Sequence, residues 1–302
     1  SLFIRVYKFS QPMADLHSWR QSDTASVARN LTRSNYDVLH PQIDSAVSID
    51  GIGRDNTFRY HFAEFPIYQL FTAYVSNLTG DIVTAGRIVS IVASLISIVF
   101  LYLLTRRYFS EKVALTAAFV YGGLPYAIFW SRAVLPDATM LMFCLGTLYF
   151  FDKWVRDSKV SNKIVSELLN VNLLLATLFF ALALIMKVFV PFLLLPMLYQ
   201  VCLRYSANIW KISLVGLTFM SVIPLFDKIR TSQPFRPASQ VIQIMSEGGH
   251  LPLKLLVVSL LVLGLYLLFR FRNEFLKIKI FVILIAVAAI PFGLWRVWMQ
   301  EW

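Results

Sequence analysis

Charged residues are scarce in this sequence. They make up 15% of its 302 residues, whereas hydrophobic residues make up 58%, and the mean hydropathy is +0.65. A soluble globular domain has about 45–50% apolar and roughly 25% charged residues. The composition argues against a soluble enzyme and predicts a polytopic membrane protein, with residues 1–302 forming a single domain.

Cysteine is nearly absent. Cys144 and Cys202 each lie inside an apolar run, where cysteine behaves as a small hydrophobic side chain. This excludes a disulfide framework and a zinc site built from cysteines. Internal repeats, low-complexity tracts and a signal peptide with a cleavage site are also missing. The chain starts without Met and stops at "WRVWMQEW", so we expect a fragment clipped at both ends.

Negative charge is in short supply relative to positive charge. Seventeen Asp and Glu accompany 28 Lys and Arg, which gives a net charge of +11. No basic stripe interleaved with aromatic residues indicates nucleic-acid binding. In a membrane protein, an excess of Lys and Arg marks the cytoplasmic loops. We therefore expect no nucleic-acid partner and use the positive charges to predict topology.

Apolar runs, in contrast, are abundant. A membrane-spanning helix needs roughly 17–25 mostly apolar residues. We predict an all-α fold, a transmembrane helix bundle over residues 82–302 that follows a truncated first span. The eight predicted spans are 82–105, 112–130, 138–154, 168–186, 188–204, 210–227, 252–269 and 279–293.

Lys and Arg cluster in every second connection between these runs, for example at Arg106–Arg107 and again at Arg156 and Lys159. The positive-inside rule places these connections in the cytoplasm. Residues 1–81 then form a large first extracytoplasmic loop, and "SRAVLPD" (131–137) lies on the same outer face. Two acidic residues far apart in sequence, Asp23 and Asp137, are thus predicted to share one face.

The first loop contains two predicted helices. Ser22 or Asp23 can cap a helix that runs to about Arg33. The segment "FPIYQLFTAYVSNL" (65–78) has apolar residues at helical spacing but spans only roughly 20 Å. Because this is too short to cross a bilayer, we predict an interfacial helix that lies on the membrane.

Five motifs follow one another over about residues 10–200: "HSWRQSDTASVARN", "HFAEFPIYQL", "GRIVSIVAS", "SRAVLPDATMLMF" and "LALIMKVFVPFLLLP". Their order resembles the GT-C superfamily of membrane glycosyltransferases. Within it, the chain is similar to the bacterial branch related to protein O-mannosyltransferases and the lipid A aminoarabinose transferase. The resemblance implies a helix bundle with a large first outer loop and a sugar donor carried on a polyprenyl phosphate.

The resemblance also implies roles for particular residues. Asp23 matches the first-loop acid that acts as catalytic base in that family, and Asp137 matches a second acid. Relatives of the aminoarabinose type carry Lys just before the Pro of the interfacial segment, whereas this chain has "AEFP" with Glu64. We therefore expect Arg59, His61 or Lys187 to bind the donor phosphate instead.

The chemistry is compatible with these residue types. Phosphate is a good leaving group, but an acceptor hydroxyl needs a carboxylate to take its proton. Negative charge that develops on the phosphate needs cations or a metal, and one base suits a single displacement with inversion. We predict catalytic roles for Asp23 and Asp137. We predict substrate binding by Trp19, Arg20, Arg59, His61, Glu64, Tyr68, Arg132 and Lys187.

Simpler explanations exist for several of these residues. Asp23 and Asp137 could merely cap helices, Trp19 and Arg20 could anchor the loop to the lipid interface, and Lys187 could lie in an outward turn. Three histidines in the first loop match no tight metal motif. We therefore predict no metal ligand and leave a divalent metal open as a cofactor.

The resulting prediction is a glycosyltransferase in the bacterial inner membrane, with several spans and an outward-facing site. Its partners are membrane lipid, a polyprenyl-phosphate sugar and an acceptor that could be a lipid, a glycan or a protein. A flippase or transport component for lipid-linked sugars is the alternative. Transporters show repeats and ionisable groups near mid-membrane, which are not evident here. A nucleotide-sugar donor is disfavoured because the acids face away from the cytoplasm.

Overall fold

The described part of the chain is helical. The computed structural model contains an isolated bridge between Gln42 and Tyr60 but no strand among the residues that it describes, which agrees with the predicted all-α class. The described residues are 2–6, 9, 12–13, 17–44, 58–62, 64–157, 167–187, 189–215, 217–218 and 251–298.

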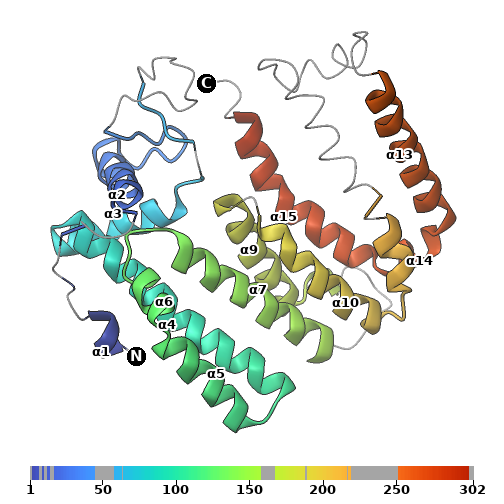
Figure 1. Cartoon of the computed structure of the whole chain (residues 1–302), viewed down its shortest axis with the longest axis horizontal. Coiled ribbons are helices and arrows are strands. Elements are labelled where there is room, and N and C mark those ends of the chain that lie inside the picture. The colour runs from blue at the N-terminus through green and yellow to red at the C-terminus, as the bar shows by residue number, and fades with distance from the viewer. Residues whose placement is uncertain are drawn as a thin grey trace. The chain divides into compact units, whose positions relative to one another are not determined.

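Three helices precede the first long apolar helix. They are α1 (Leu2–Val6), α2 (Ser18–Arg33) and α3 (Ile67–Thr79). Helices α2 and α3 pack against each other and against the start of α4 (Figure 1). Helix α3 begins directly after Pro66 and ends at Gly80, whose φ of 73° suits the left-handed helix end that glycine adopts without strain.

The predicted N-cap of α2 is wrong. The helix begins at Ser18, and the residue before it, His17, has a left-handed φ of 58° and makes no side-chain cap. The backbone N–H of Gln21 donates to the carbonyl of His17 at 3.0 Å, so the helix already includes the "WRQ" stretch. No glycine or proline interrupts that stretch, so the helix extends upstream of Asp23.

Helix α3 turns its more polar face inward. Tyr68, Thr72 and Ala73 are buried, whereas Phe71 and Leu78 are 42% and 88% exposed. An outward apolar stripe of this kind is typical of a helix that lies at a membrane surface. The interfacial position itself stays a prediction.

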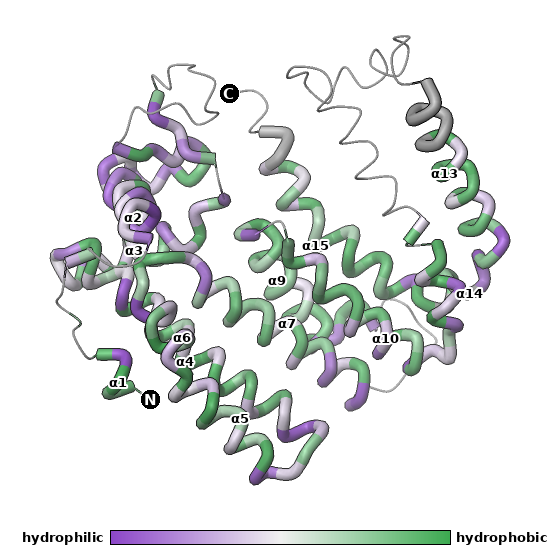
Figure 2. The backbone as a smooth tube through the Cα atoms, in the orientation of Figure 1, coloured by the Kyte–Doolittle hydropathy of each residue, from purple (hydrophilic) through white to green (hydrophobic). Residues whose placement is uncertain are grey.

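Helix α4 (Ile82–Tyr108) has 27 residues and begins at Asp81, whose side chain accepts a hydrogen bond from the Thr84 N–H at 2.8 Å. Hydrogen bonds from the side chain and then the backbone of Thr84 lower the pKa of the Asp81 carboxyl. Within the described ranges, α4 is the one helix whose length and composition suffice to cross a membrane. The predicted count of eight spans is therefore not confirmed. Figure 2 shows the hydrophobic residues along α4 and α7 and the hydrophilic residues gathered on α2.

The predicted span 112–130 is divided in the structure. Helix α5 (Glu111–Gly123) ends at a glycine pair, and α6 (Pro125–Trp130) starts afresh after Leu124. Proline lacks the N–H needed to continue the helix, and the preceding residue is extended. Most of the predicted span 210–227 lies outside the described residues. The remaining helices are α7 (Asp137–Asp157), α9 (Val171–Met186), the 3₁₀ helix η1 (Val190–Leu193), α10 (Leu194–Arg204), α13 (Leu251–Arg270), α14 (Arg272–Lys277) and α15 (Lys279–Trp298).

The chain divides into two compact units, Ser1–Leu194 with Ile285–Met299, and Leu195–Leu284 with Gln300–Trp302. In the first unit, α7 packs against both α4 and α9. Gly146 permits the close approach to α9, because a Cβ atom there would lie 2.2 Å from Cδ1 of Phe179. In the second unit, the Lys211 ammonium lies 5.7 Å from the centre of the Phe271 ring.

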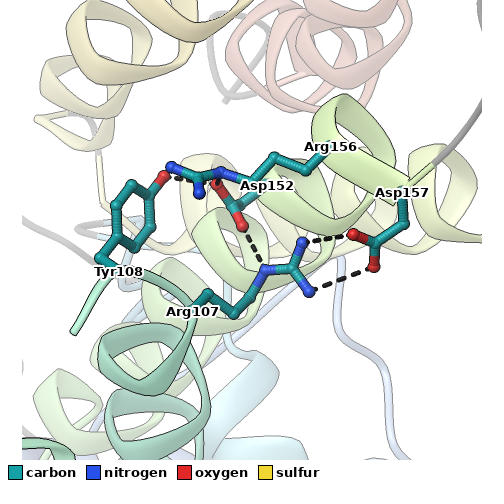
Figure 3. Close-up of polar contacts among 5 residues, drawn as sticks. All are labelled: Arg107, Tyr108, Asp152, Arg156 and Asp157. Carbon is teal, nitrogen blue, oxygen red and sulfur yellow. Dashed lines mark hydrogen bonds and ion pairs between the residues drawn. The ribbon is translucent and has the colours of Figure 1, made fainter. Parts of the chain in front are cut away.

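The C-terminal ends of α4 and α7 are joined by ion pairs, which we call the Asp152 cluster: Arg107, Tyr108, Asp152, Arg156 and Asp157 (Figure 3). The buried Asp152 carboxylate accepts hydrogen bonds from Arg107 and Tyr108 and pairs with Arg156 Nε at 3.0 Å. Arg107 also binds both oxygens of Asp157, at 3.1 and 2.7 Å. These contacts place the basic last turns of α4 and α7, with Arg107 and Arg156, at one end of the helix pair.

Candidate functional site

Charged side chains converge on Glu64 near the opposite end of α4. Arg20 Nη2 lies 3.6 Å and Lys187 Nζ 2.6 Å from the same oxygen, Oε2 of Glu64. The side chains of Glu64 and Lys187 are only 7% and 11% exposed. We call Arg20, Asp23, His61, Glu64 and Lys187 the Glu64 cluster. Its members come from α2, from the segment before α3 and from the residue that follows α9.

Lys187 reaches the cluster because α9 ends there. Its N–H still donates to the carbonyl of Ala183 at 3.0 Å, but its backbone is extended, with φ −145° and ψ 123°. Pro191 follows in η1. The chain therefore leaves the helix at Lys187, and the ammonium group lies against Glu64 instead of continuing along an apolar helix face.

His61 does not supply positive charge to this cluster at neutral pH. Burial lowers the pKa of His61 below its ordinary 6.5, and Arg20 lowers the pKa further, while Asp23 and Glu64 oppose the shift. Arg59 is exposed and takes part in the backbone contact with Ile43 through its carbonyl. Of the three residues expected to replace the missing phosphate-binding lysine, Lys187 is thus the cation that shares Glu64 with Arg20.

Asp23 lies inside α2 and is half-buried. The helix starts five residues earlier, so the simpler explanation of Asp23 as a helix cap does not hold. Asp23 interacts electrostatically with His61 and follows Arg20 by about one turn of α2, and for these reasons we count it in the Glu64 cluster.

Asp137 lies in a different environment, as the half-buried first residue of α7. The carbonyl of Pro136 accepts the hydrogen bond from the Met140 N–H at 2.9 Å, so Asp137 is in the first turn, where the helix dipole favours a negative charge. Asp137 lines a cavity of about 310 Å³. It also interacts electrostatically with Tyr68, whose pKa is raised by burial, so that the phenol stays protonated.

Tyr68 connects α3 to α4, and Gln21 connects α2 to the segment before α7. The Tyr68 hydroxyl donates to the carbonyl of Gly86 at 2.8 Å, and Ser90 Oγ donates to that of Ala133 at 2.7 Å. The Val134 N–H donates to Oε1 of the buried Gln21 at 3.0 Å. Gln21 was not predicted as a site residue, although Gln21 stands between two predicted site residues in "RQSD".

Other predicted residues lie outside the Glu64 cluster. Trp19 is 67% exposed, and Arg132 is half-buried in the turn after α6. The His17 ring faces Trp130, with ring centres 5.6 Å apart, and His40 bonds Asp37 at 2.7 Å. Within the described ranges, no group of three or more His, Cys, Asp or Glu side chains could hold a metal ion.

The comparison with protein families identifies the chain. Residues 64–226 match the family described as dolichyl-phosphate-mannose-protein mannosyltransferase. The match covers more than half of the 302 residues and includes Glu64, Asp137 and Lys187. No curated protein and no solved structure matches the chain. The chain therefore belongs to the dolichyl-phosphate-mannose-protein mannosyltransferase family, whose members are membrane glycosyltransferases of the GT-C type.

Proposed function

We propose that this protein transfers a sugar from a polyprenyl-phosphate donor to an acceptor hydroxyl by a single displacement with inversion, with Asp23 as the base. The observation that carries the proposal is the convergence of Arg20 and Lys187 on one buried carboxylate oxygen, that of Glu64, with Asp23 about one turn after Arg20 on α2. Membership in a mannosyltransferase family supports the reaction class.

The two cations suit the donor phosphate. When the bond between the anomeric carbon and the phosphate oxygen breaks, the phosphate gains a second negative charge. Arg and Lys are the usual protein ligands for such charge, and they act most strongly where water is excluded. Glu64 contacts both cations, so we assign it the role of holding Arg20 and Lys187 in place.

Asp23 completes the reaction on the acceptor side. Its carboxylate takes the proton of the acceptor hydroxyl while the hydroxyl oxygen forms the new bond to the anomeric carbon. The bonding electrons of the broken bond leave with the phosphate. Because the hydroxyl attacks opposite the leaving group, the anomeric configuration inverts.

We place this site on the outer face of a bacterial inner membrane, in a chain with several spans. The alternating cationic segments support that orientation, and the ends of α4 and α7 that carry Arg107 and Arg156 do lie together. Cysteine variants at residues 23 and 137 test it with a maleimide that does not cross membranes. Labelling that occurs only from the cytoplasmic side would overturn the orientation.

The base assignment is tested with Asp23→Asn in the full-length protein, in membranes supplied with radiolabelled polyprenyl-phosphate mannose. We expect incorporation of label to fall by about 10²–10⁴-fold, with binding of polyprenyl phosphate unchanged. Ser22→Ala, at the exposed neighbouring position, is the matched control. Undiminished transfer by Asp23→Asn would refute the base assignment. If the unaltered protein bound the donor without any turnover, the lipid-transport alternative would be favoured.

A further inference from the structure

The cavity beside Asp137 differs in chemistry from the Glu64 cluster. It has a volume of about 310 Å³ and lies between α4, the α5–α6 break and α7. Its wall is mostly apolar and aromatic, with Leu124, Trp130, Met140 and Leu141 among the lining residues. Of the described residues that line it, only Asp137 is a carboxylate, and none is Lys or Arg. Small-molecule sites are commonly apolar cavities of roughly 300–1,000 Å³ that hold a few oriented polar groups.

The break between α5 and α6 forms one side of this cavity. Leu124 and Tyr126 line it and are 45% and 70% exposed, so its border towards solvent or lipid is apolar. Next to this cavity, the buried Arg5 donates to Oγ of the lining residue Ser94 at 3.2 Å and to the Gly122 carbonyl at 2.9 Å. These hydrogen bonds connect α1 to α4 and to the end of α5, and thereby fix the shape of the wall.

The charge in the cavity selects against phosphate. The Asp137 carboxylate would repel a phosphate group placed beside it, whereas the cations that attract phosphate, Arg20 and Lys187, meet at Glu64. A carboxylate accepts hydrogen bonds from hydroxyl groups, and the apolar wall stabilises a hydrocarbon portion of the same molecule. The cavity therefore suits a molecule with a hydrocarbon part and an uncharged, hydroxyl-bearing part.

Two contacts connect this cavity to the helix that carries Asp23. The Val134 N–H donates to Gln21 Oε1, and the His17 ring packs on Trp130, a lining residue. A molecule in the cavity thus lies near the start of α2, the helix that carries Asp23.

We propose that the cavity binds the acceptor, and that the acceptor is a lipid with an uncharged, hydroxyl-bearing head group. Its hydrocarbon part packs against Leu124, Met140 and Leu141, and a head-group hydroxyl donates to Asp137. The inference rests on the proposed function, because it names the acceptor class for that reaction.

The test measures protection of a cysteine placed in the cavity. The full-length protein is reconstituted in nanodiscs with Cys144→Ser and Cys202→Ser, and Met140→Cys is labelled with a maleimide. The probes are octyl glucoside and dodecyl phosphate, each below its critical micelle concentration, and glucose. Leu178→Cys, on α9 and at a position 52% exposed, is the control site, and Leu141→Cys replaces Met140→Cys if that variant does not fold.

We expect octyl glucoside to slow labelling at the cavity at least fivefold, without an effect at the control site, and glucose and dodecyl phosphate to have little effect. Asp137→Asn should weaken the protection by octyl glucoside. Stronger protection by dodecyl phosphate would show a site for the donor lipid and overturn the assignment. Protection by no probe, or equal protection at the control site, would overturn it as well.

This readout requires no sugar transfer, so the two proposals can fail separately. Protection by octyl glucoside together with undiminished transfer by Asp23→Asn would refute the mechanism but not the acceptor site. Loss of transfer in Asp23→Asn without any protection would refute the acceptor site alone.

Discussion

The Glu64 and Asp152 clusters have similar composition and different geometry. Each surrounds a carboxylate with two cations. Asp152 is completely buried and uses both oxygens, for Arg107, Tyr108 and Arg156. Glu64 uses a single oxygen for both cations, and Arg20 lies 3.6 Å away with 41% of its side chain exposed.

This difference in how the carboxylate oxygens bind their cations leads us to expect a structural role for the Asp152 cluster and a ligand-binding role for the Glu64 cluster. In the Asp152 cluster, Arg107 binds a second carboxylate, that of Asp157, and Arg156 lies 3.9 Å from the centre of the Tyr108 ring, so each cation has a second partner within the protein. Arg20, in contrast, is loosely held and open to a further ligand. A closed ion network fixes two helices to each other, whereas an open one can bind an anion. The following predictions test that division between stability and function.

Asp152→Asn should have the largest effect on stability. Removing one partner of a buried ion pair leaves uncompensated charge, and we expect a loss of about 3–5 kcal/mol in the free energy of unfolding, measured by denaturant titration in detergent. Asp157→Asn, at a side chain 47% exposed, is the matched control and should cost about 1 kcal/mol or less. Donor binding by the folded fraction should persist. Equal stability of the Asp152→Asn variant and the unaltered protein would contradict the structural role.

Two glycines allow a second comparison, with an expected loss of about 1–3 kcal/mol for each. In Gly146→Ala, the new Cβ would meet the Phe179 ring between α7 and α9. In Gly86→Ala, it would lie 2.6 Å from Val134 Cγ1 and 3.1 Å from the Tyr68 hydroxyl. Both variants should unfold more easily, but only Gly86→Ala should also reduce sugar transfer per folded molecule, because it displaces the segment that Gln21 holds. Equal transfer by the two variants would show that this segment has no role in the reaction.

The sequence was sufficient where local pattern and composition decide the structure. The apolar spacing of residues 65–78 predicted α3, and the longest apolar run predicted α4. The ends of helices were less predictable. The apolar length of residues 112–130 suggested one span, although Gly123 and Pro125 mark the break between α5 and α6.

The tertiary contacts could not be predicted from local pattern. Glu64 and Lys187 were both named as candidates, but their ion pair joins residues 123 positions apart, and neither has a nearby sequence signal for the other. The Asp152 cluster and the Gln21 contact were not anticipated at all. Each depends on how helices distant in sequence pack, and that packing follows from surfaces such as the one at Gly146 and not from periodicity.

Lys187→Met tests whether the Glu64 cluster binds phosphate. Losing one charge-assisted hydrogen bond should raise the KM for the polyprenyl-phosphate sugar by about tenfold or more, since such bonds contribute about 1.5–3 kcal/mol. Lys187→Arg should retain most of the affinity because it keeps the charge. Lys112→Met, at an exposed cation of α5, serves as the control. An unchanged KM in Lys187→Met would show that this ammonium pairs with Glu64 only for stability.

The smallest expected effect is the pH dependence that His61 contributes. Burial lowers the pKa of His61 in the folded protein, so between that lowered pKa and 6.5 the unfolded chain binds more protons than the folded one. Stability should therefore fall as the pH decreases from 6.5 through this window. Asp157, whose pKa is lowered by its hydrogen bonds with Arg107, stabilises the fold fully above its ordinary pKa of 3.8 and loses this effect only as the pH falls below that value. His61→Gln should flatten the profile of unfolding free energy between pH 5 and 7, and Asp157→Asn should not. If the His61→Gln variant kept the original slope in that range, His61 would not be the group whose protonation lowers stability there, and the two clusters would not differ in their response to acid.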